Sequence, residues 1–256
     1  MKIATWNVNS LSVRLPQVLD WLNALQPDLL ALQETKLTDD RFPQAELQVA
    51  GYASAFLGQK TYNGVALLSR MPLAEVQRNI PGFDDDQARV VAATTASGVR
   101  VVGAYFPNGQ APDSDKFAYK MRWLDALRRW LGSEIQRHPR LVLLGDFNIA
   151  PEDRDVYDPV LLAGQIHCTP EERKQFQQLL DLGLFDAFRA FDQPEKSWSW
   201  WDYRNLAFRR NRGLRIDHIL ASNVMRPNLQ SCSIDKEPRR AERASDHAPV
   251  IATFAD

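Results

Sequence analysis

Short apolar runs that end in acidic or amide side chains are the feature of this sequence that most restricts its fold. Runs of this length, rich in leucine and valine and bounded by turn residues, are typical of strands buried inside a domain. Ser97-Gly98, between two of these runs, is a hairpin signal. We predict strands at Lys2–Trp6, Leu29–Leu32, Gly64–Leu68, Val90–Ala93, Val99–Ala104, Leu141–Leu144, Ile216–Ala221 and Pro249–Phe254.

Longer segments have the helical period instead. Residues 11–25 and 117–131 place leucine, valine and aromatic residues on one face. The string Thr169-Pro170-Glu171-Glu172 is typical of a capped helix start, and we expect this helix to reach about Leu182 before Gly183. The alternation of strands and helices predicts an α/β fold with sheets between helices. Because no linker or repeat is visible, we expect a single domain over residues 1–256.

Composition excludes several classes of protein. The 256-residue chain has a formal net charge of −1, and 45% of its residues are hydrophobic, which is typical of a globular protein rather than of disordered, collagen-like or strongly basic chains. No apolar stretch approaches the roughly 18 residues of a membrane span, and we see no signal peptide. Two cysteines, Cys168 and Cys232, are too few for a disulfide framework. We therefore expect a cytoplasmic monomer without a membrane partner.

Polar side chains beside the predicted strands indicate a shared site. Any one acid in such a place is most often a turn or capping residue, and a lone histidine is most often structural. In α/β folds, however, residues just past strand ends line the ligand crevice. Several acids buried together are costly unless a cation or hydrogen-bond donors compensate, so their number favours a functional site. The candidates are Asn7, Asn9, Glu34, Tyr105, Asp146, Asn148, Asp217, Asp246 and His247.

The donor types favour a hard divalent cation. Carboxylate and amide oxygens dominate, and the four histidines and two cysteines show no zinc-binding spacing. Such donors suit Mg²⁺, with Mn²⁺ as a substitute, and Mg²⁺ is usually shared with a substrate phosphate. The sequence has no GxxxxGK[ST] or GxGxxG string, so no nucleotide cofactor is indicated. A phosphomonoester or phosphodiester is therefore the expected substrate.

One segment combines aromatic and basic residues. From Ser197 the chain reads SWSWWDYRNLAFRRNRGLR, with no acid between Tyr203 and Ile216. Arginines bind phosphates and aromatic rings stack on exposed bases or sugars, so this segment is a candidate nucleic-acid contact. The alternative is a solvated loop whose tryptophans fill the core. Other basic residues are individually weaker indications; they are Lys116, Lys120, Arg122, Arg239, Arg240 and Arg243.

Ten strings follow one another along essentially the whole chain: TWNVNSL, LLALQETK, GVALLSR, YFPNGQ, KFAYKMRWL, LLGDFNIAPEDRDVYDP, TPEER, SWSWWDYR, NRGLRIDHILAS and SDHAPV. In this order they resemble the exonuclease III family of abasic-site endonucleases, within the endonuclease/exonuclease/phosphatase superfamily. The ordered set is highly specific, and SWSWWDYR with NRGLRID favours the bacterial exonuclease III branch over lipid or inositol phosphatases. The resemblance implies a four-layered α/β sandwich, in which two mixed sheets face each other and helices lie outside.

The resemblance also implies roles for the site residues. Asp146 would activate the attacking water, and Asp217 would orient His247 toward the phosphate. Asn148 and Tyr105 would contact that phosphate. The implied metal ligands are Glu34, Asp246, Asn7, Asp146 and Asn148. The implied substrate contacts are Asn9, His167, Trp200, Arg204, Arg212 and Leu214, of which Trp200 and Leu214 would wall the pocket for an abasic sugar.

His167 departs from the family pattern. It stands in AGQIHCTPEER, where relatives generally carry Gly, Ala or Ser beside the DNA-binding cleft. An imidazole there adds bulk and a possible phosphate contact. Because rotating a nucleotide out of a duplex already costs about a few kcal/mol, a modest clash could hinder an internal abasic nucleotide while a frayed 3′ end still enters. The alternative is that His167 points into solvent and has no effect.

The sequence thus predicts a Mg²⁺-dependent DNA repair hydrolase that acts on double-stranded DNA with damaged or recessed 3′ ends or abasic sites. We expect 3′→5′ exonuclease and 3′-phosphatase activity, with abasic-site endonuclease activity weakened by His167. One alternative is a phosphatase or phosphodiesterase of the same superfamily that acts on a small molecule or lipid head group, which the Arg-aromatic segment disfavours. The other is a DNA-binding module without catalysis, which the intact catalytic positions disfavour.

Overall fold

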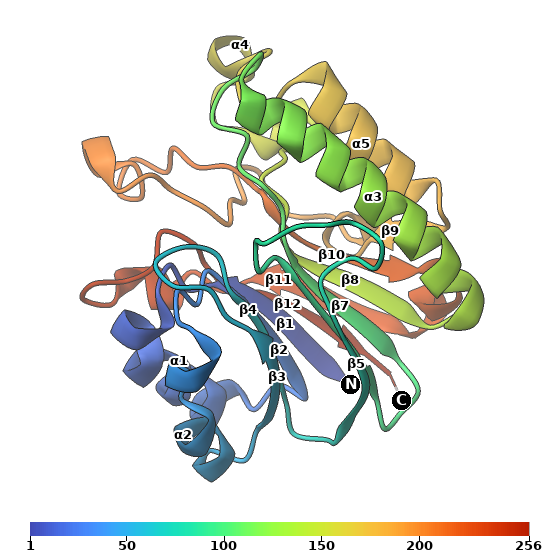
Figure 1. Cartoon of the computed structure of the whole chain (residues 1–256). Coiled ribbons are helices and arrows are strands. Elements are labelled where there is room, and N and C mark those ends of the chain that lie inside the picture. Colours follow the sequence, from blue (N-terminus) through green and yellow to red (C-terminus); the bar gives the residue numbers. More distant parts are fainter. Residues whose placement is uncertain (256) are drawn as a thin grey trace.

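Two mixed six-stranded sheets pack face to face in the computed structural model, which describes residues 1–255 (Figure 1). In spatial order, the first sheet consists of β11 (Leu229–Ile234), β12 (Val250–Phe254), β1 (Lys2–Asn7), β2 (Leu29–Gln33), β4 (Val65–Ser69) and β3 (Ala53–Leu57). The second consists of β5 (Leu73–Arg78), β6 (Val90–Thr95), β7 (Arg100–Tyr105), β8 (Leu141–Asp146), β10 (Asp217–Ser222) and β9 (Leu184–Asp186). β1 pairs with β2 and β7 with β8 in parallel, and the other neighbours are antiparallel.

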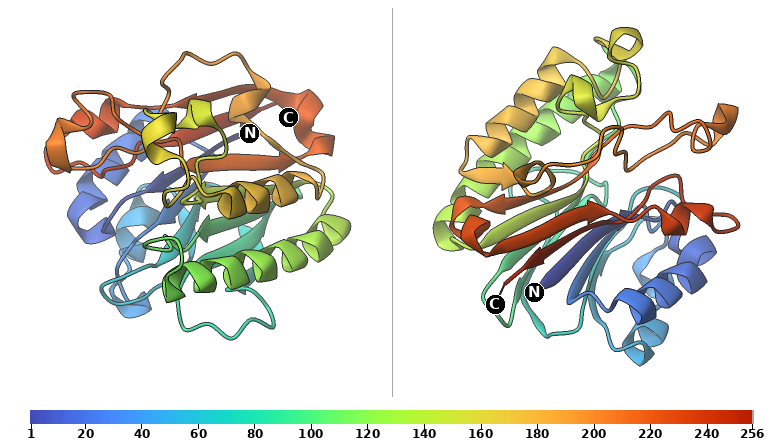
Figure 2. Two further views of the ribbon diagram at one scale, coloured as in Figure 1. Left: turned by 90° about the horizontal axis from the view of Figure 1, so that it is seen from above. Right: turned by 180° about the vertical axis from the view of Figure 1, so that it is seen from behind.

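Helices cover the outer faces of the sheets (Figures 1 and 2). α1 (Leu11–Leu25) and α2 (Gln44–Val49) lie on the first sheet, whereas α3 (Asp115–Arg137) and α5 (Pro170–Leu180) lie on the second. The predicted four-layered α/β sandwich is therefore confirmed. The remaining helical pieces are α4 (Pro159–Leu162) and 3₁₀ turns at Asp39–Arg41, Asp153–Asp155, Phe188–Ala190, Arg204–Leu206, Asn223–Asn228 and Glu237–Arg240.

The main core lies between the sheets and explains why the inner strands have apolar sequences. Ile3 and Leu29 of the first sheet share one buried cluster with Val101, Leu144 and Ile219 of the second. Two further clusters join each sheet to its helices, so the inner strands are buried on both faces. Within residues 1–255, none of the helices combines the length and apolar character needed to cross a membrane.

All the strands predicted from apolar runs are present, with ends shifted by at most two residues. The four strands that the sequence did not reveal, β3, β5, β9 and β11, are the edge strands of the two sheets. β5 has a solvated side and the mixed sequence LAEVQR, so it lacks a continuous apolar run, whereas the buried β9 is only three residues long. The short α2 and α4 were not predicted either.

The helix caps follow the sequence closely. Ser114 accepts a hydrogen bond from the backbone N–H of Phe117 and begins α3. Thr169 and Glu172 form the predicted capping box of α5, with Pro170 at its first position. This helix ends at Leu180, two residues before the predicted Leu182.

Candidate active site

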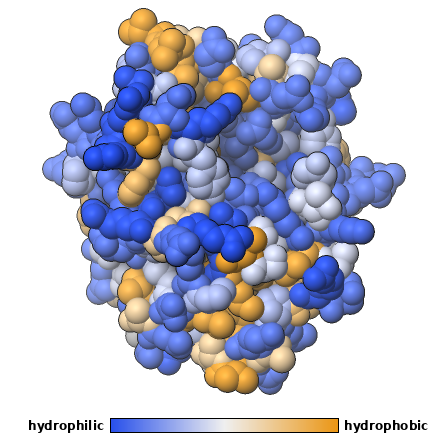
Figure 3. All heavy atoms as spheres, turned by 90° about the vertical axis from the view of Figure 1, so that its left-hand side faces the viewer, coloured by the Kyte–Doolittle hydropathy of each residue, from blue (hydrophilic) through white to orange (hydrophobic). Residues whose placement is uncertain are grey.

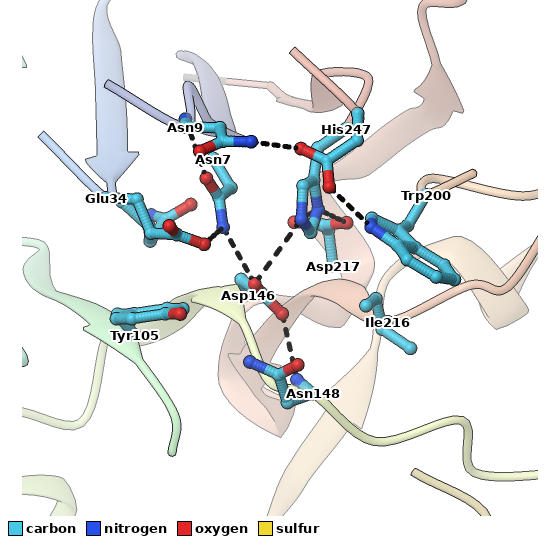
Figure 4. Close-up of polar contacts among 12 residues, drawn as sticks. Asn7, Asn9, Glu34, Tyr105, Asp146, Asn148, Trp200, Ile216, Asp217 and His247 are labelled. Carbon is cyan, nitrogen blue, oxygen red and sulfur yellow. Dashed lines mark hydrogen bonds and ion pairs between the residues drawn. The ribbon is translucent and has the colours of Figure 1, made fainter. Parts of the chain in front are cut away.

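Strand ends from both sheets meet at one edge of the sandwich. In the first sheet, Asn7 of β1 lies beside Gln33 of β2, and Glu34 follows β2 directly. In the second sheet, Asp146 of β8 pairs with Asp217 of β10 and lies level with Tyr105 of β7. Residues distant in sequence therefore surround a common space (Figure 4).

Asn7 links two carboxylates in this space. Its Nδ2 donates to Glu34 Oε1 at 2.8 Å and to Asp146 Oδ2 at 2.9 Å, and its Oδ1 accepts from the backbone N–H of Asn9 at 2.9 Å. Asn7 therefore holds Glu34 and Asp146 side by side (Figure 4). In this conformation the amide oxygen of Asn7 is directed toward the backbone of Asn9.

His247 lies between two carboxylates. Its Nδ1 is 2.9 Å from Asp217 Oδ2, and its Nε2 is 3.7 Å from Asp146 Oδ2. An ionised carboxylate can only accept hydrogen bonds, so Nδ1 of His247 carries a proton and donates it in the hydrogen bond to Asp217. Burial by itself would lower the pKa of His247, but the negative charges of Asp217 and Asp146 raise that pKa to about 10. The imidazole is therefore protonated at neutral pH.

Asp146 is the buried carboxylate at the centre of the site. Burial raises its pKa and the positive charge of His247 opposes that effect, while Asp217 raises the pKa further, to about 7. Its proton is therefore exchangeable near neutral pH. Gly145 lets Asp146 reach this place, because a Cβ at position 145 would lie 1.8 Å from the carbonyl oxygen of Ala104 on β7.

Two carboxylates that could hold a metal ion, Glu34 and Asp146, come together here with His247 beside them. Atoms of Glu34, Asp146 and His247 all lie within 4.8 Å of one another. The chain already places a cation beside them, since Lys36 Nζ is 2.8 Å from Glu34 Oε2 and 2.5 Å from Asn9 Oδ1. Two carboxylates held at such short range need positive charge, and their hard oxygen atoms suit a divalent cation. The residues present therefore fit a metal site.

Asp246 lies beside this cluster rather than within it. Its Oδ1 accepts from Asn9 Nδ2 at 3.0 Å, and its Oδ2 accepts from Trp200 Nε1 at 2.9 Å. Both oxygens thus accept hydrogen bonds from protein donors, and the carboxylate connects the loop at Asn9 to the indole of Trp200. Each oxygen of Asp246 still has a second lone pair, so the sequence-based prediction that Asp246 ligates a metal remains a prediction.

Asn148 and Tyr105 border the opposite side of the site. A left-handed backbone at Asn148, with φ of 50°, turns the chain straight after β8. Its Nδ2 donates to the carbonyl oxygen of Phe106 at 3.1 Å, and its Oδ1 accepts from Asn108 Nδ2 at 3.2 Å. Burial, together with the charges of Glu34 and Asp146, raises the pKa of Tyr105 well above its usual range. Tyr105 therefore remains a phenol that can donate a hydrogen bond.

A hollow of about 520 Å³ opens next to these residues, and we call it the first hollow. His167 lines it and is only 9% exposed, so the alternative that this side chain points into solvent is wrong. Its Nδ1 lies 2.8 Å from the carbonyl oxygen of Asn148 and must donate to it. Burial and the nearby charge of Lys120 lower the pKa of His167 to about 4. The other lining residues include Asn108, Tyr157, Trp200, Arg204, Arg212 and Leu214.

The neutral state of His167 limits what it can contact. With the proton on Nδ1, its Nε2 carries a lone pair and cannot donate to a phosphate oxygen. The phosphate contact that the sequence predicts for His167 would therefore require Nε2 to take up a proton when DNA binds. The imidazole therefore acts on the first hollow through its bulk, because the ring takes up part of the space.

The Arg-aromatic segment divides into buried and exposed parts. Trp198 and Trp201 are buried in the core, as the alternative interpretation held, whereas Tyr203 is 52% exposed. Arg204 and Arg212 are exposed beside the first hollow. The loops at residues 200–212 and 236–246 project on the face shown in Figure 3, which is mainly hydrophilic and hollowed near its centre. Arg204 and Arg212 are therefore accessible to a ligand in the first hollow.

Two of the weaker basic candidates are not on the surface. Lys120 is fully buried against Glu172, and Arg239 is buried with its guanidinium 4.7 Å from the ring of Phe208. The hypothesis that they contact nucleic acid is therefore wrong. The structure adds Lys36 and Asn108 to the site, although both already stood in the strings LLALQETK and YFPNGQ. Their side-chain types alone gave no signal.

Comparisons with known proteins agree with this geometry. A model of the Endonuclease/Exonuclease/phosphatase family matches residues 4–247. Exodeoxyribonuclease III of Haemophilus influenzae is 35% identical over 266 residues, with 99% of this chain and 100% of the relative covered. Two structures of NExo, described as a 3′ phosphatase from Neisseria bound to a product DNA hairpin and as a 3′-5′ exonuclease from Neisseria meningitidis, are each 52% identical, with TM-scores of 0.98 and 100% of both chains covered. An AP endonuclease from Archaeoglobus fulgidus is 37% identical, with a TM-score of 0.94 and 99% of both chains covered.

Proposed function

Because this chain belongs to the Endonuclease/Exonuclease/phosphatase family, we propose that the described site hydrolyses phosphate esters at the 3′ ends of DNA in a Mg²⁺-dependent reaction. The chain is a DNA repair nuclease, as its similarity to exodeoxyribonuclease III and to NExo indicates. The observation that carries the proposal is the gathering of Glu34, Asp146 and His247 around one space, with Asp217 behind the imidazole. The substrates are DNA ends that carry a 3′-phosphate or a recessed 3′-hydroxyl.

The roles of Asp146 and His247 follow from their protonation. Asp146 would be ionised with Mg²⁺ beside it, and its carboxylate can then accept the proton of the attacking water. His247, whose pKa is about 10, stays cationic and stabilises the charge that builds up on the phosphate. Asp217 holds the imidazole so that Nε2 faces Asp146 and the space where the phosphate would bind. The oxygen of water bonds to phosphorus as its proton passes to Asp146. The bond from phosphorus to the 3′ oxygen breaks, and that oxygen takes up a proton from the surrounding water to become the 3′-hydroxyl.

The other groups bind and orient the phosphate. Tyr105 donates from its phenol, and Asn148 donates through the amide N–H that Phe106 does not occupy. Glu34 and Asp146 would hold Mg²⁺, for which Mn²⁺ can substitute, and the ion would neutralise phosphate charge and lower the pKa of bound water. Asn7 and Asp246 would support this site by fixing carboxylates and loops. Asn9, Trp200, Arg204, Arg212 and Leu214 would contact the DNA.

A substrate panel tests the proposal. Duplexes with a 3′-phosphate, a recessed 3′-hydroxyl or an internal abasic site would be incubated with and without a chelator. General-base catalysis is worth roughly 10²- to 10⁴-fold, so Asp146→Asn should lose about that much turnover while DNA affinity changes only a few-fold. Asp192→Asn, at an exposed carboxylate, is the control. DNA binding without any Mg²⁺-dependent cleavage by the unaltered chain would favour a binding module instead.

His167 is proposed to set the preference between substrates. Its ring occupies part of the first hollow, beside Trp200 and Leu214, where an abasic sugar would enter. His167→Gly should raise abasic-site incision relative to 3′-phosphatase activity. The backbone favours this replacement, because position 167 has φ of 73°, a conformation that suits glycine. An unchanged ratio of the two activities would reject this role.

The proposal also includes the oligomeric state and the cellular compartment of the enzyme. We expect a single-domain monomer in the bacterial cytoplasm, where Cys168 and Cys232, both free and buried, stay reduced. Size-exclusion chromatography with light scattering would test the monomer.

A further inference from the structure

A second hollow, of about 590 Å³, adjoins the first. The two share Tyr157 and Arg212, whose guanidinium carbon lies 6.0 Å from the centre of the Tyr157 ring. The path from the catalytic residues therefore leads through the first hollow, past this pair, and into the second. The lining of the second hollow also includes Asp158, Leu161, Lys196, Arg210 and Asn211.

The second hollow carries a surplus of positive charge. Lys196, Arg210 and Arg212 line it, and within residues 1–255 none of them forms an ion pair. The one carboxylate present, Asp158, accepts from the backbone N–H of Leu161 at 3.0 Å and so caps α4. Three cations against one engaged carboxylate favour a ligand of high negative charge.

The backbone that carries two of these cations is firmly held. The buried Trp198 donates from Nε1 to the carbonyl oxygen of Asn211 at 3.0 Å, and the buried Trp201 donates to Asn211 Oδ1 at 3.3 Å. The backbone N–H of Arg212 donates to Ala207 at 2.9 Å. Arg210 and Arg212 therefore project from a turn fixed on both sides of Asn211, which is what a preorganised anion site requires.

Strand polarity identifies the ligand, and this step rests on the function proposed above. When the bond from phosphorus to the 3′ oxygen breaks, the group removed lies on the 3′ side of the scissile bond. The first hollow must then accept that group, and the second hollow lies one position further along the same path. At a nick or gap, the next charged group in that direction is the 5′-phosphate of the downstream strand.

We propose that the second hollow binds this 5′-phosphate and so directs 3′-end trimming to gapped DNA. A terminal phosphate monoester carries about −1.5 to −2 charges at pH 7, more than an internal diester, which suits three cations. When a 3′-phosphate occupies the catalytic site, the first hollow spans the missing nucleotide. A one-nucleotide gap is therefore the substrate expected to suit the phosphatase reaction best.

The test uses three 3′-phosphate duplexes: a one-nucleotide gap with a downstream 5′-phosphate, the same gap with a 5′-hydroxyl, and a recessed end with no downstream strand. Affinity is measured by fluorescence anisotropy in chelator, and phosphate release by single-turnover kinetics in Mg²⁺. We expect the unaltered chain to bind the 5′-phosphate gap about tenfold more tightly than the 5′-hydroxyl gap, which corresponds to about 1.4 kcal/mol. This preference should decline as the gap is lengthened.

The double variant Lys196→Gln/Arg210→Gln should lose the preference while it hydrolyses the recessed end within about twofold of the unaltered rate, because only the second hollow is changed. Arg129→Gln/Lys174→Gln removes the same charge from exposed positions of α3 and α5 and should keep the preference. A preference that persists in the first variant overturns the proposal. So does an equal weakening toward all three duplexes, which indicates general backbone attraction. No release from the recessed end by the unaltered chain would instead refute the proposed function.

Discussion

Lys120 offers a quantitative test of how the interior supports the active site. Its ammonium group is fully buried with Glu172, at 2.5 Å from Glu172 Oε1, and it donates to the carbonyl oxygens of Asn148 at 2.8 Å and Asn108 at 3.3 Å. The second oxygen of Glu172 accepts from the backbone N–H of Thr169 at 3.0 Å. One cation thus connects two loops of the site to the start of α5.

The perturbation is Lys120→Met, which keeps the unbranched shape of the side chain, shortens it by one atom and removes its charge. Loss of one partner from a buried ion pair costs roughly 3–5 kcal/mol, because the other charge is left unpaired. For a chain of this size, 1 kcal/mol shifts Tm by about 2–4 °C, so Tm should fall by roughly 6–20 °C. Because the loop at Asn148 also loses its donor, we expect kcat to fall about 10- to 100-fold with little change in KM for DNA.

Arg100→Met separates stability from positioning. Arg100 of β7 forms a buried ion pair with Glu134 of α3 at 2.8 Å. Glu134 lies near the opposite end of α3 from Lys120. This variant should lose stability and keep kcat within about twofold, measured well below both melting temperatures.

A double-mutant cycle tests the route of the effect. Asn148→Ala should lower kcat by itself, and Lys120→Met should lower it no further in that background, since both changes act through Asn148. Thermal unfolding and steady-state kinetics give all the quantities needed. A wild-type kcat in Lys120→Met, or effects that multiply in the double variant, would refute the reasoning.

Two further predictions concern protons. Because the pKa of Asp146 is about 7 without a metal, Mg²⁺ or Mn²⁺ must displace its proton. Calorimetry should therefore show a metal affinity about tenfold higher at pH 8 than at pH 6, with proton release on binding at pH 6. A metal affinity that does not depend on pH would contradict this. Burial lowers the pKa of His167 to about 4. Between pH 6.5 and pH 4 the imidazole is therefore protonated in the unfolded chain but not in the folded chain, so the folded state loses stability as the pH falls. Between pH 7 and pH 5 the unaltered chain should therefore lose about 2 kcal/mol more stability than His167→Gly, as measured by urea unfolding, and equal losses would show that the imidazole is charged when folded.

The inner strands were predictable because burial on both faces leaves a continuous apolar run. Leu29–Leu32 and Leu141–Leu144 are examples, and both lie in the middle of a sheet. The edge strands β5 and β11 were not predictable, since one side of each faces solvent and tolerates residues such as Glu75 and Gln230. Their pairing energy comes from neighbours that are distant in sequence.

Most of the candidate site was visible as a set of residue types, but its geometry was not. The sequence indicated Glu34, Asp146 and His247, and the structure brings them together. It gave no sign that Asp246 is engaged by Asn9 and Trp200, or that Lys36 lies against Glu34. These contacts depend on side-chain directions that local patterns do not encode.

The amino-acid sequence by itself determined the two apolar sheets, the capped helices and the acids at the strand ends, because each depends on periodicity or on neighbours a few residues away. Only the tertiary structure decided protonation and access. Lysine is normally a surface residue, but in this fold Lys120 is a buried structural cation. Burial also lowers the pKa of His167 to about 4, which its residue type alone does not indicate. Desolvation and contact across the two sheets set these properties, and both arise only when distant segments pack together.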